Sequence, residues 1–229
     1  MLYIFIICQI LNFVLFIPSG VNSSYPVINR SSAINRSSII NRSIIDYKPF
    51  ARLEANYPEI TGMSNYTFQG DLNEFIENRV KSFLNDTLKQ AKDTYDILSK
   101  SEPAPYEGLV SYKYYINGSI LSIIMDYYSY LGGAHGVTKR ESINVDTKTS
   151  TFIQLKSLFK RDFDYRQYIL ANINDTIKKN PENYFSSELD SFNENNFYLA
   201  KNNDLVIYFN EYEIAPFASG IPEFKMPLN

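Results

Sequence analysis

The longest run of apolar residues at helical spacing begins near Asp71. From there to about Lys100, apolar side chains recur at steps of three and four, which places them on one face of a helix. Asp71, with Glu74 three residues later, resembles the capping pattern that begins helices. We therefore predict a long helix whose apolar face packs against a core. That face consists of Leu72, Phe75, Ile76, Val80, Phe83, Leu84, Leu88, Ala91, Tyr95 and Leu98.

Beyond the predicted helix, apolar and polar residues alternate as they do in strands. Residues 110–116 and 119–130 lie on either side of Asn117-Gly118, a pair that predicts a hairpin because both turn residues favour positive φ. Two further strands at 141–145 and 149–153 complete a meander of about four antiparallel strands. On the second strand, one predicted face carries Leu121, Ile123, Met125 and Tyr127, and the other carries Ser122, Ile124, Asp126 and Tyr128.

The last third of the chain predicts a second helix over 164–179 and two shorter strands at 197–200 and 205–212. The whole pattern indicates an α+β fold, with antiparallel sheet or sheets, a long N-terminal helix and a second helix packed on one face. Irregular strand over 46–60 leads into it. We place the folded domain at 46–229, with 46–155 and 156–229 as candidate subdomains.

The residues before the predicted domain show a different pattern of apolar and polar positions. Residues 1–17 form an apolar run without a charged side chain, shorter than the ~20 residues that a membrane helix needs. Small residues follow, so we predict a secretory signal over 1–23, with an uncleaved membrane anchor as the alternative. The hexapeptides INRSSA, INRSSI and INRSII then repeat over 28–45. They are too polar to build a packed solenoid, so 24–45 is predicted to be a low-complexity linker.

Composition narrows the possible chemistry. The only cysteine, Cys8, lies in the apolar run, so the predicted mature protein has no disulfide and no cysteine metal site. His135 is the only histidine, whereas zinc enzymes normally use several histidine and carboxylate ligands. A net charge of −3 without a basic stripe does not indicate nucleic-acid binding. We expect a binding protein rather than an enzyme, with no metal or cofactor.

The first candidate binding segment is GGAHG, at 132–136. Three glycines in five residues allow a tight turn or a close approach to another surface. Gly133, His135 and Gly136 are its candidate contact residues. The alternative interpretation is a structural turn in which His135 hydrogen-bonds the backbone.

The second candidate segment is the proline-stiffened loop 212–222, with Tyr212, Pro216 and Phe217 as candidate contact residues. Aromatic anchors dominate binding hot spots, although Phe217 could equally be buried in the core. The preceding stretch is acidic and would suit a cationic partner, the alternative being an ordinary solvated surface. Its charges are Glu182, Glu188, Asp190, Glu194, Asp204, Glu211 and Glu213, against Lys201.

Three stretches, at 119–136, 145–159 and 196–224, together with the long helix before them, resemble the extracytoplasmic domain of RsiV-like proteins. That family includes lysozyme-sensing anti-sigma factors and the non-catalytic N-terminal part of PdaC-type peptidoglycan deacetylases. The resemblance implies an α+β fold and a binding role at the cell envelope. The sensing members carry a sigma-binding segment before a membrane span, whereas the apolar run here starts at Leu2, so anti-sigma activity is not expected.

Together these observations predict a secreted or cell-surface binding module. Its expected partner is lysozyme or a similar cationic protein, and the alternative is a cell-wall glycan-binding module that recognises peptidoglycan. Contact with a membrane is expected only through an uncleaved N-terminal segment.

Overall fold

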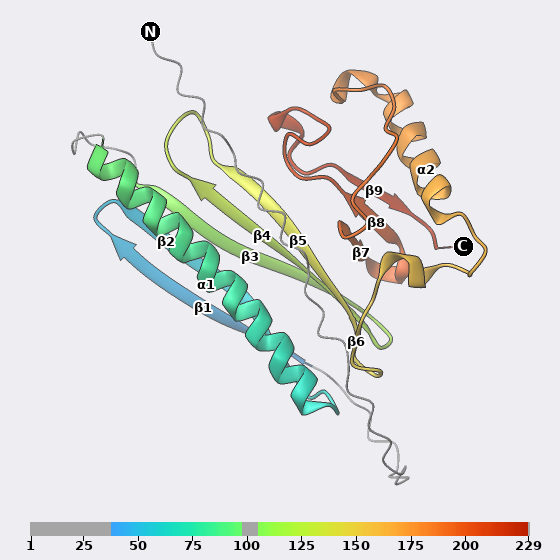
Figure 1. Ribbon diagram of the computed structural model, residues 1–229, viewed down its shortest axis with the longest axis horizontal. Coiled ribbons are helices and arrows are strands. Elements are labelled where there is room, and N and C mark those ends of the chain that lie inside the picture. The colour runs from blue at the N-terminus through green and yellow to red at the C-terminus, as the bar shows by residue number, and fades with distance from the viewer. Residues whose placement is uncertain (1–37, 98–104, 229) are drawn as a thin grey trace. The chain divides into compact units, whose positions relative to one another are not determined.

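The computed structural model describes residues 38–97 and 105–228. Within these ranges the chain forms a six-stranded sheet, a three-stranded sheet, two α-helices and short 3-10 turns (Figure 1). The α+β fold predicted from the sequence is confirmed. Neither α-helix in the described ranges combines the length and the hydrophobicity that a membrane span requires.

The six-stranded sheet has its strands in chain order from one edge to the other. Neighbouring strands are antiparallel except β2 and β3, which run parallel over Ala51–Ala55 and Tyr106–Val110. The long helix α1 connects this parallel pair, because parallel neighbours require a crossover. The strands are β1 (Ser38–Lys48), β2 (Ala51–Thr61), β3 (Tyr106–Asn117), β4 (Ile120–Tyr130), β5 (Val137–Asp146) and β6 (Thr151–Phe152).

Strand β1 corrects the predicted linker. Residues 38–45, assigned to the linker with the hexapeptide repeat, pair with β2 in an unbroken antiparallel register. A polar repeat can form an edge strand because such a strand needs to bury few of its side chains. Here Ile39 and Ile44 pack against the core, and Arg42 pairs with Glu59 of β2.

Helix α1 (Tyr66–Ile97) begins earlier than the predicted residue Asp71. Asn65 provides the cap, because its side-chain oxygen accepts a hydrogen bond from the Phe68 N–H at 3.1 Å. The predicted end at Lys100 lies outside the described residues. The buried apolar side chains of the helix are five of those predicted, namely Leu72, Ile76, Val80, Leu84 and Ala91.

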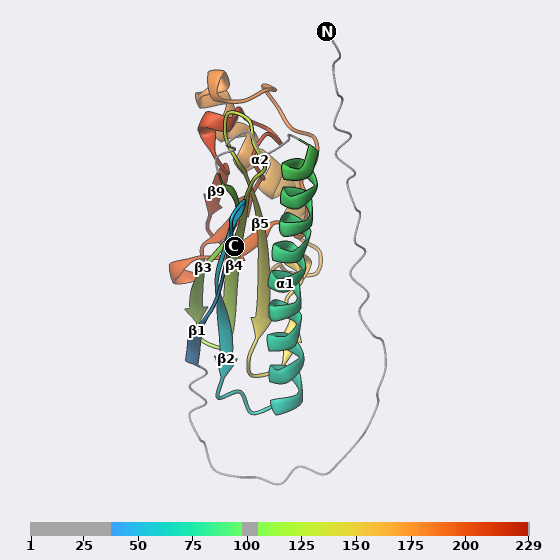
Figure 2. The ribbon, with the colours of Figure 1, turned by 90° about the vertical axis from the view of Figure 1, so that its left-hand side faces the viewer.

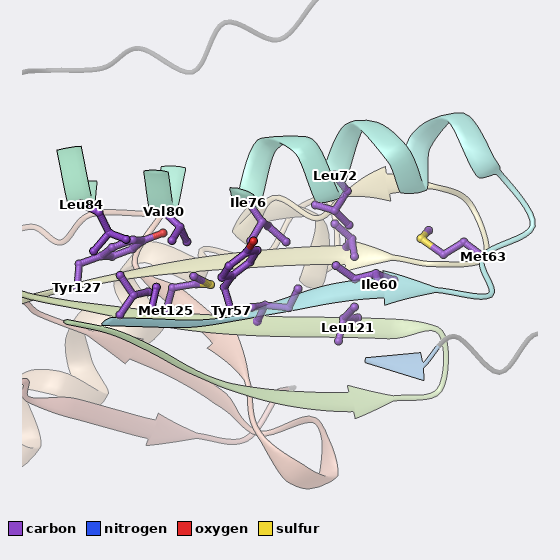
Figure 3. Close-up of a cluster of buried hydrophobic side chains, with 14 of the residues drawn as sticks. Tyr57, Ile60, Met63, Leu72, Ile76, Val80, Leu84, Leu121, Met125 and Tyr127 are labelled. Carbon is purple, nitrogen blue, oxygen red and sulfur yellow. The ribbon is translucent and has the colours of Figure 1, made fainter. Parts of the chain in front are cut away.

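Helix α1 lies along one face of the six-stranded sheet (Figure 2). Figure 3 shows Leu121, Met125 and Tyr127 of β4 pointing toward it, and Ile123 is buried in the same cluster. The predicted division of β4 into two faces is therefore confirmed. The hairpin before β4 turns at Gly118-Ser119, one residue later than predicted, because Asn117 pairs with Ile120.

The remaining chain forms the second sheet and α2 (Tyr165–Lys179). Asp164 caps α2 by accepting a hydrogen bond from the Gln167 N–H at 3.0 Å. Helix α2 packs against the three-stranded sheet rather than beside α1, so each helix covers a sheet of its own. The strands, in spatial order, are β7 (Phe197–Leu199), β8 (Leu205–Tyr208) and β9 (Glu223–Met226). Strand β8 ends before the predicted residue Tyr212.

Candidate binding site

The two predicted binding loops meet at one place. The His135 ring stacks on Phe217, with ring centroids 3.6 Å apart and an interplanar angle of 13°. His135 Nε2 lies 3.1 Å from Tyr212 Oη, and the rings of Tyr212 and Phe217 are 5.8 Å apart. We call His135, Tyr212 and Phe217 the aromatic cluster. Its members come from segments far apart in the sequence.

Hydrogen bonds fix the orientation of the His135 ring. Nδ1 lies 3.0 Å from the carbonyl oxygen of Gly136. A carbonyl can only accept, so Nδ1 donates, and in the neutral ring Nε2 then accepts from the Tyr212 hydroxyl. The hydrogen bond from His135 to the backbone, which the alternative interpretation as a structural turn predicted, is therefore present, while the His135 side chain remains exposed. Both ring nitrogens are engaged, so the ring is held in one position within the cluster.

The backbone conformation and packing of this loop explain why glycine occupies these positions. Gly132 and Gly133 both have φ of +96°, a region that favours glycine. The Tyr130 hydroxyl donates to the Gly133 carbonyl oxygen at 3.0 Å. Gly136 is buried, and a Cβ atom there would overlap the ring of Tyr128. Of the three predicted contact residues in this loop, His135 and Gly133 are thus exposed, and Gly136 serves close packing.

The second loop holds Tyr212 in an uncommon conformation. Its φ of +63° is rare for a bulky side chain, and such conformations gather at functional sites. The Tyr212 side chain is nevertheless 48% exposed. Phe217 is half-buried at the start of a 3-10 turn (Phe217–Ser219), and Pro216 before it is exposed. Phe217 thus lies at the surface against His135 and outside the hydrophobic clusters.

Side-chain hydrogen bonds dock this loop onto strand β5. Glu211 Oε2 accepts from the Thr138 N–H at 2.8 Å, and Asn210 Oδ1 accepts from the Arg140 N–H at 2.7 Å. These two side chains take the place of a neighbouring strand along that part of β5. Within the loop, Glu213 Oε2 accepts from the Asn210 N–H at 2.8 Å. Burial raises the pKa of Glu213, and this hydrogen bond only partly opposes the shift.

A buried charge cluster joins the two sheets beneath the site. Arg140 donates to Asp126 through Nε and Nη2 at 2.6 and 2.7 Å, and it also pairs with Glu223 of β9. Its side chain is only 10% exposed. Burial acts to lower the pKa of Arg140, but the two carboxylates outweigh it and the net shift is upward. The guanidinium therefore stays charged and links β4, β5 and β9.

A second polar contact holds the edge strand β7. The Ser122 hydroxyl donates to Asn144 Oδ1 at 2.6 Å, and Asn144 Nδ2 donates to the Phe197 carbonyl at 2.8 Å. The Leu199 N–H in turn donates to Ser122 Oγ at 3.1 Å. All three bonds are buried, so they specify where the three-stranded sheet lies on the six-stranded one.

Sequence reasoning missed two exposed apolar residues on segments that adjoin the two loops. Phe185 is 58% exposed, and its N–H donates to the Ile214 carbonyl within the second loop at 2.9 Å. Val137, two residues after His135, is 46% exposed. A phenylalanine inside the polar run after Asn183 is the sequence signal that could have identified Phe185.

Much of the predicted acidic stretch is engaged within the molecule. Glu194 pairs with Arg166, Asp204 pairs with Lys225, and Glu211 and Glu213 accept backbone N–H groups. The exposed carboxylates of the stretch are Glu182, Glu188, Asp190 and Glu213. Glu188 and Asp190 line a shallow groove along α2 together with the cations Arg166 and Lys178. Across 38–97 and 105–228, no cluster of three His, Cys, Asp or Glu residues is arranged to hold a metal ion.

Comparisons with known proteins agree with this architecture. The family model "Deacetylase PdaC" matches residues 44–138, and that of a protein family of unknown function, DUF3298, matches 156–229. The Bacillus subtilis anti-sigma-V factor RsiV is 27% identical over 199 residues, which cover 80% of this chain and 65% of RsiV. The peptidoglycan-N-acetylmuramic acid deacetylase PdaC of the same species is 27% identical over 152 residues, which cover 62% of this chain and 32% of PdaC.

Two crystal structures of DUF3298 proteins share the fold. The protein from Bacteroides fragilis has a TM-score of 0.57 at 21% identity, covering 84% of this chain and 89% of its own. The protein from Pseudomonas aeruginosa has a TM-score of 0.55 at 14% identity, covering 85% of this chain and 91% of its own. The resemblance read from the sequence is thereby confirmed: the chain is similar to RsiV over most of its length, and in it a region that matches the PdaC family model precedes one that matches DUF3298.

Proposed function

We propose that this domain is an extracytoplasmic module that binds a cationic protein of the lysozyme type. Its proposed contact surface is the aromatic cluster with the neighbouring residues Val137 and Phe185. The observation that carries the proposal is the meeting of two distant loops in one exposed aromatic group. Ring side chains that are fixed before binding lose little entropy on association, which makes them good anchors.

The relatives support a recognition role. RsiV is named an anti-sigma factor and PdaC a deacetylase, and this chain is similar to both. RsiV and PdaC have different activities, so the region that both share with this chain is better explained by a common task, such as recognition, than by either activity. We therefore propose that the domain recognises a ligand and catalyses no reaction. The presence of a single histidine in the chain supports this proposal.

Charge supports a cationic partner. Glu182, Glu188 and Asp190 are exposed on the segment that also carries Phe185. Carboxylates around an aromatic contact surface attract a basic protein and raise its association rate, with little effect on dissociation. Binding is therefore expected to weaken as salt rises.

Binding to immobilised lysozyme at low and moderate salt tests the proposal. We expect Phe217→Ala and Tyr212→Ala each to weaken binding by roughly 30-fold, the effect of losing a hot-spot residue. Tyr66→Ala is the matched control, because it removes a 78% exposed ring from the start of α1. No retention of lysozyme at either salt concentration, or an equal loss in the control, would contradict the proposal.

A glycan-binding module is the second candidate. The exposed Tyr212 ring beside the stacked His135 and Phe217 rings forms a platform on which a sugar ring could lie. Sedimentation with insoluble peptidoglycan separates the two candidates. Sedimentation that Tyr212→Ala abolishes, in a protein that does not retain lysozyme, would favour the glycan.

A further inference from the structure

The two edges of the six-stranded sheet are protected very differently. At one edge, β6 is only two residues long, and the exposed part of β5 has its Thr138 and Arg140 N–H groups bonded by side chains. At the other edge, β1 runs for eleven residues in an unbroken register with β2. No strand in the described part of the chain pairs with the outer side of β1. Long open edges are templates for pairing with another chain.

The backbone groups on that outer side can be identified. The Asn73 side chain bonds both the N–H and the carbonyl of Ile60 at 2.8 Å, so the backbone of Ile60 points away from β1. Ile39 lies opposite Ile60 in an antiparallel pair, so its N–H and carbonyl also point outward. Alternation along the strand gives the same direction to Asn41, Ser43, Ile45 and Tyr47. Pro58 lies opposite Asn41. Its lack of an N–H agrees with the alternation, because the backbone of residue 58 also points away from β1 and needs no hydrogen bond to it.

We propose that a second copy of this chain pairs antiparallel with β1, centred on Ile44. In this register Ser43 lies opposite Ile45 of the other copy, and Asn41 lies opposite Tyr47. All four are outward-facing residues, as the hydrogen bonds require. The exposed side chains of Ile45 and Tyr47, at 64% and 60%, gain neighbours across the new pairing.

The charges on β1 select this register. Centred on Ile44, the pairing places Arg42 opposite Asp46 of the other copy, and by symmetry it does so twice. These are non-hydrogen-bonded pairs, in which side chains approach most closely. Pairing centred on Ile45 would instead place Arg42 opposite Lys48, and pairing centred on Ser43 would place it opposite Ile44. Arg42 and Asp46 bind Glu59 and Lys48 within their own chain, but their side chains remain 56% and 40% exposed.

Disulfide trapping in the full chain tests the proposal. In a Cys8→Ser background, Ile44→Cys places two thiols across the symmetry axis. Cα atoms about 4.5 Å apart in a non-hydrogen-bonded pair fall within disulfide range. We expect Ile44→Cys to form a covalent dimer under mild oxidation at least tenfold faster than Ile45→Cys, the matched control. Equal rates in the two variants, or no dimer in either, would overturn the proposal.

A proline substitution supplies an independent measurement. Ile45→Pro removes one outward N–H without removing a bond to β2, since proline is tolerated on the solvent side of an edge strand. We expect light scattering of the full chain in detergent to show a dimer that Ile45→Pro converts to monomer. Ile45→Thr, which keeps the N–H, should leave the dimer intact. Unchanged circular dichroism confirms the fold, and a monomeric starting protein would refute the pairing whatever the fate of lysozyme binding.

Discussion

The two faces of the six-stranded sheet are held by different kinds of interaction. On the α1 face, Ile123 and Met125 of β4 lie in a continuous apolar cluster with the helix. On the other face, Ile124 packs in a smaller apolar cluster with the C-terminal sheet, and Ser122 and Asp126 bond Asn144 and Arg140, which in turn reach Phe197 and Glu223 of that sheet. Apolar packing is strong and carries little directional information, whereas buried hydrogen bonds and ion pairs are satisfied in one arrangement only. We call the α1 face the apolar face; on the other face, the buried polar bonds specify where the C-terminal sheet lies.

The largest expected effect is on the apolar face. Ile123→Ala removes a fully buried side chain, and we expect a loss of about 4 kcal/mol in the free energy of unfolding. Urea denaturation followed by circular dichroism measures it. Amide exchange in 210–217, in the native state, should change little, since that loop bonds the β5 edge of the sheet and not the α1 face. A large increase in amide exchange confined to 210–217 would contradict the different roles assigned to the two faces.

Arg140→Ala is expected to lower the free energy of unfolding less than Ile123→Ala does, but to loosen the loop 210–217 more. Asp126 and Glu223 would lose their cation, but they are 28% and 35% exposed, so we expect a loss of about 3 kcal/mol. Because Arg140 links β5 to β9, native-state amide exchange in 210–217 should increase. Arg140→Lys, which keeps the charge but not the bidentate bond, is the control. Its amide exchange in 210–217 should lie between those of the unmodified chain and Arg140→Ala. An Arg140→Ala protein with unchanged exchange in that loop would refute the orienting role.

Gly136→Ala tests the close packing under the binding loop. The added methyl group would overlap the Tyr128 ring, and relief of this overlap should cost about 2 kcal/mol of stability. The shift of His135 that follows should also weaken ligand binding. The double variant Gly136→Ala with Tyr128→Leu removes the overlapping ring and should recover part of the stability. No recovery would mean that another contact requires glycine.

The smallest expected effect is an acid-dependent one at the rim of the apolar face. Burial acts to raise the pKa of Glu141, but the adjacent Arg79 outweighs it, so the folded-state pKa lies below the ordinary value of 4.5. A lowered pKa gives stability that is present above about pH 4.5 and is lost as the pH falls through the folded-state value. We expect Glu141→Gln to lose roughly 1 kcal/mol at pH 7, because both partners are partly exposed. Its loss of stability between pH 5 and 3, in urea titrations, should be shallower than that of the unmodified chain.

Local patterns predicted the elements well where the physics is local. The apolar spacing of α1, the two faces of β4 and the extent of α2 depend on neighbouring residues, and all agree with the structure. Errors arose where distant contacts outweigh local preference. The polar repeat at 38–45 becomes a strand because β2 offers it a partner. The early start of α1 is a different, local error, because the Asn65 cap bonds Phe68 three residues later.

The sequence by itself determined the α+β composition, the two glycine- and proline-bearing loops and the family resemblance. Each of these follows from residue type and spacing over a few residues. Tertiary structure alone decided that His135 stacks on Phe217, that Gly136 packs against Tyr128, and that β1 is an edge strand among the described residues. The stacking of His135 on Phe217 depends on where contacts such as the ion pair between Arg140 and Glu223 place one sheet on the other, and no local pattern encodes that placement.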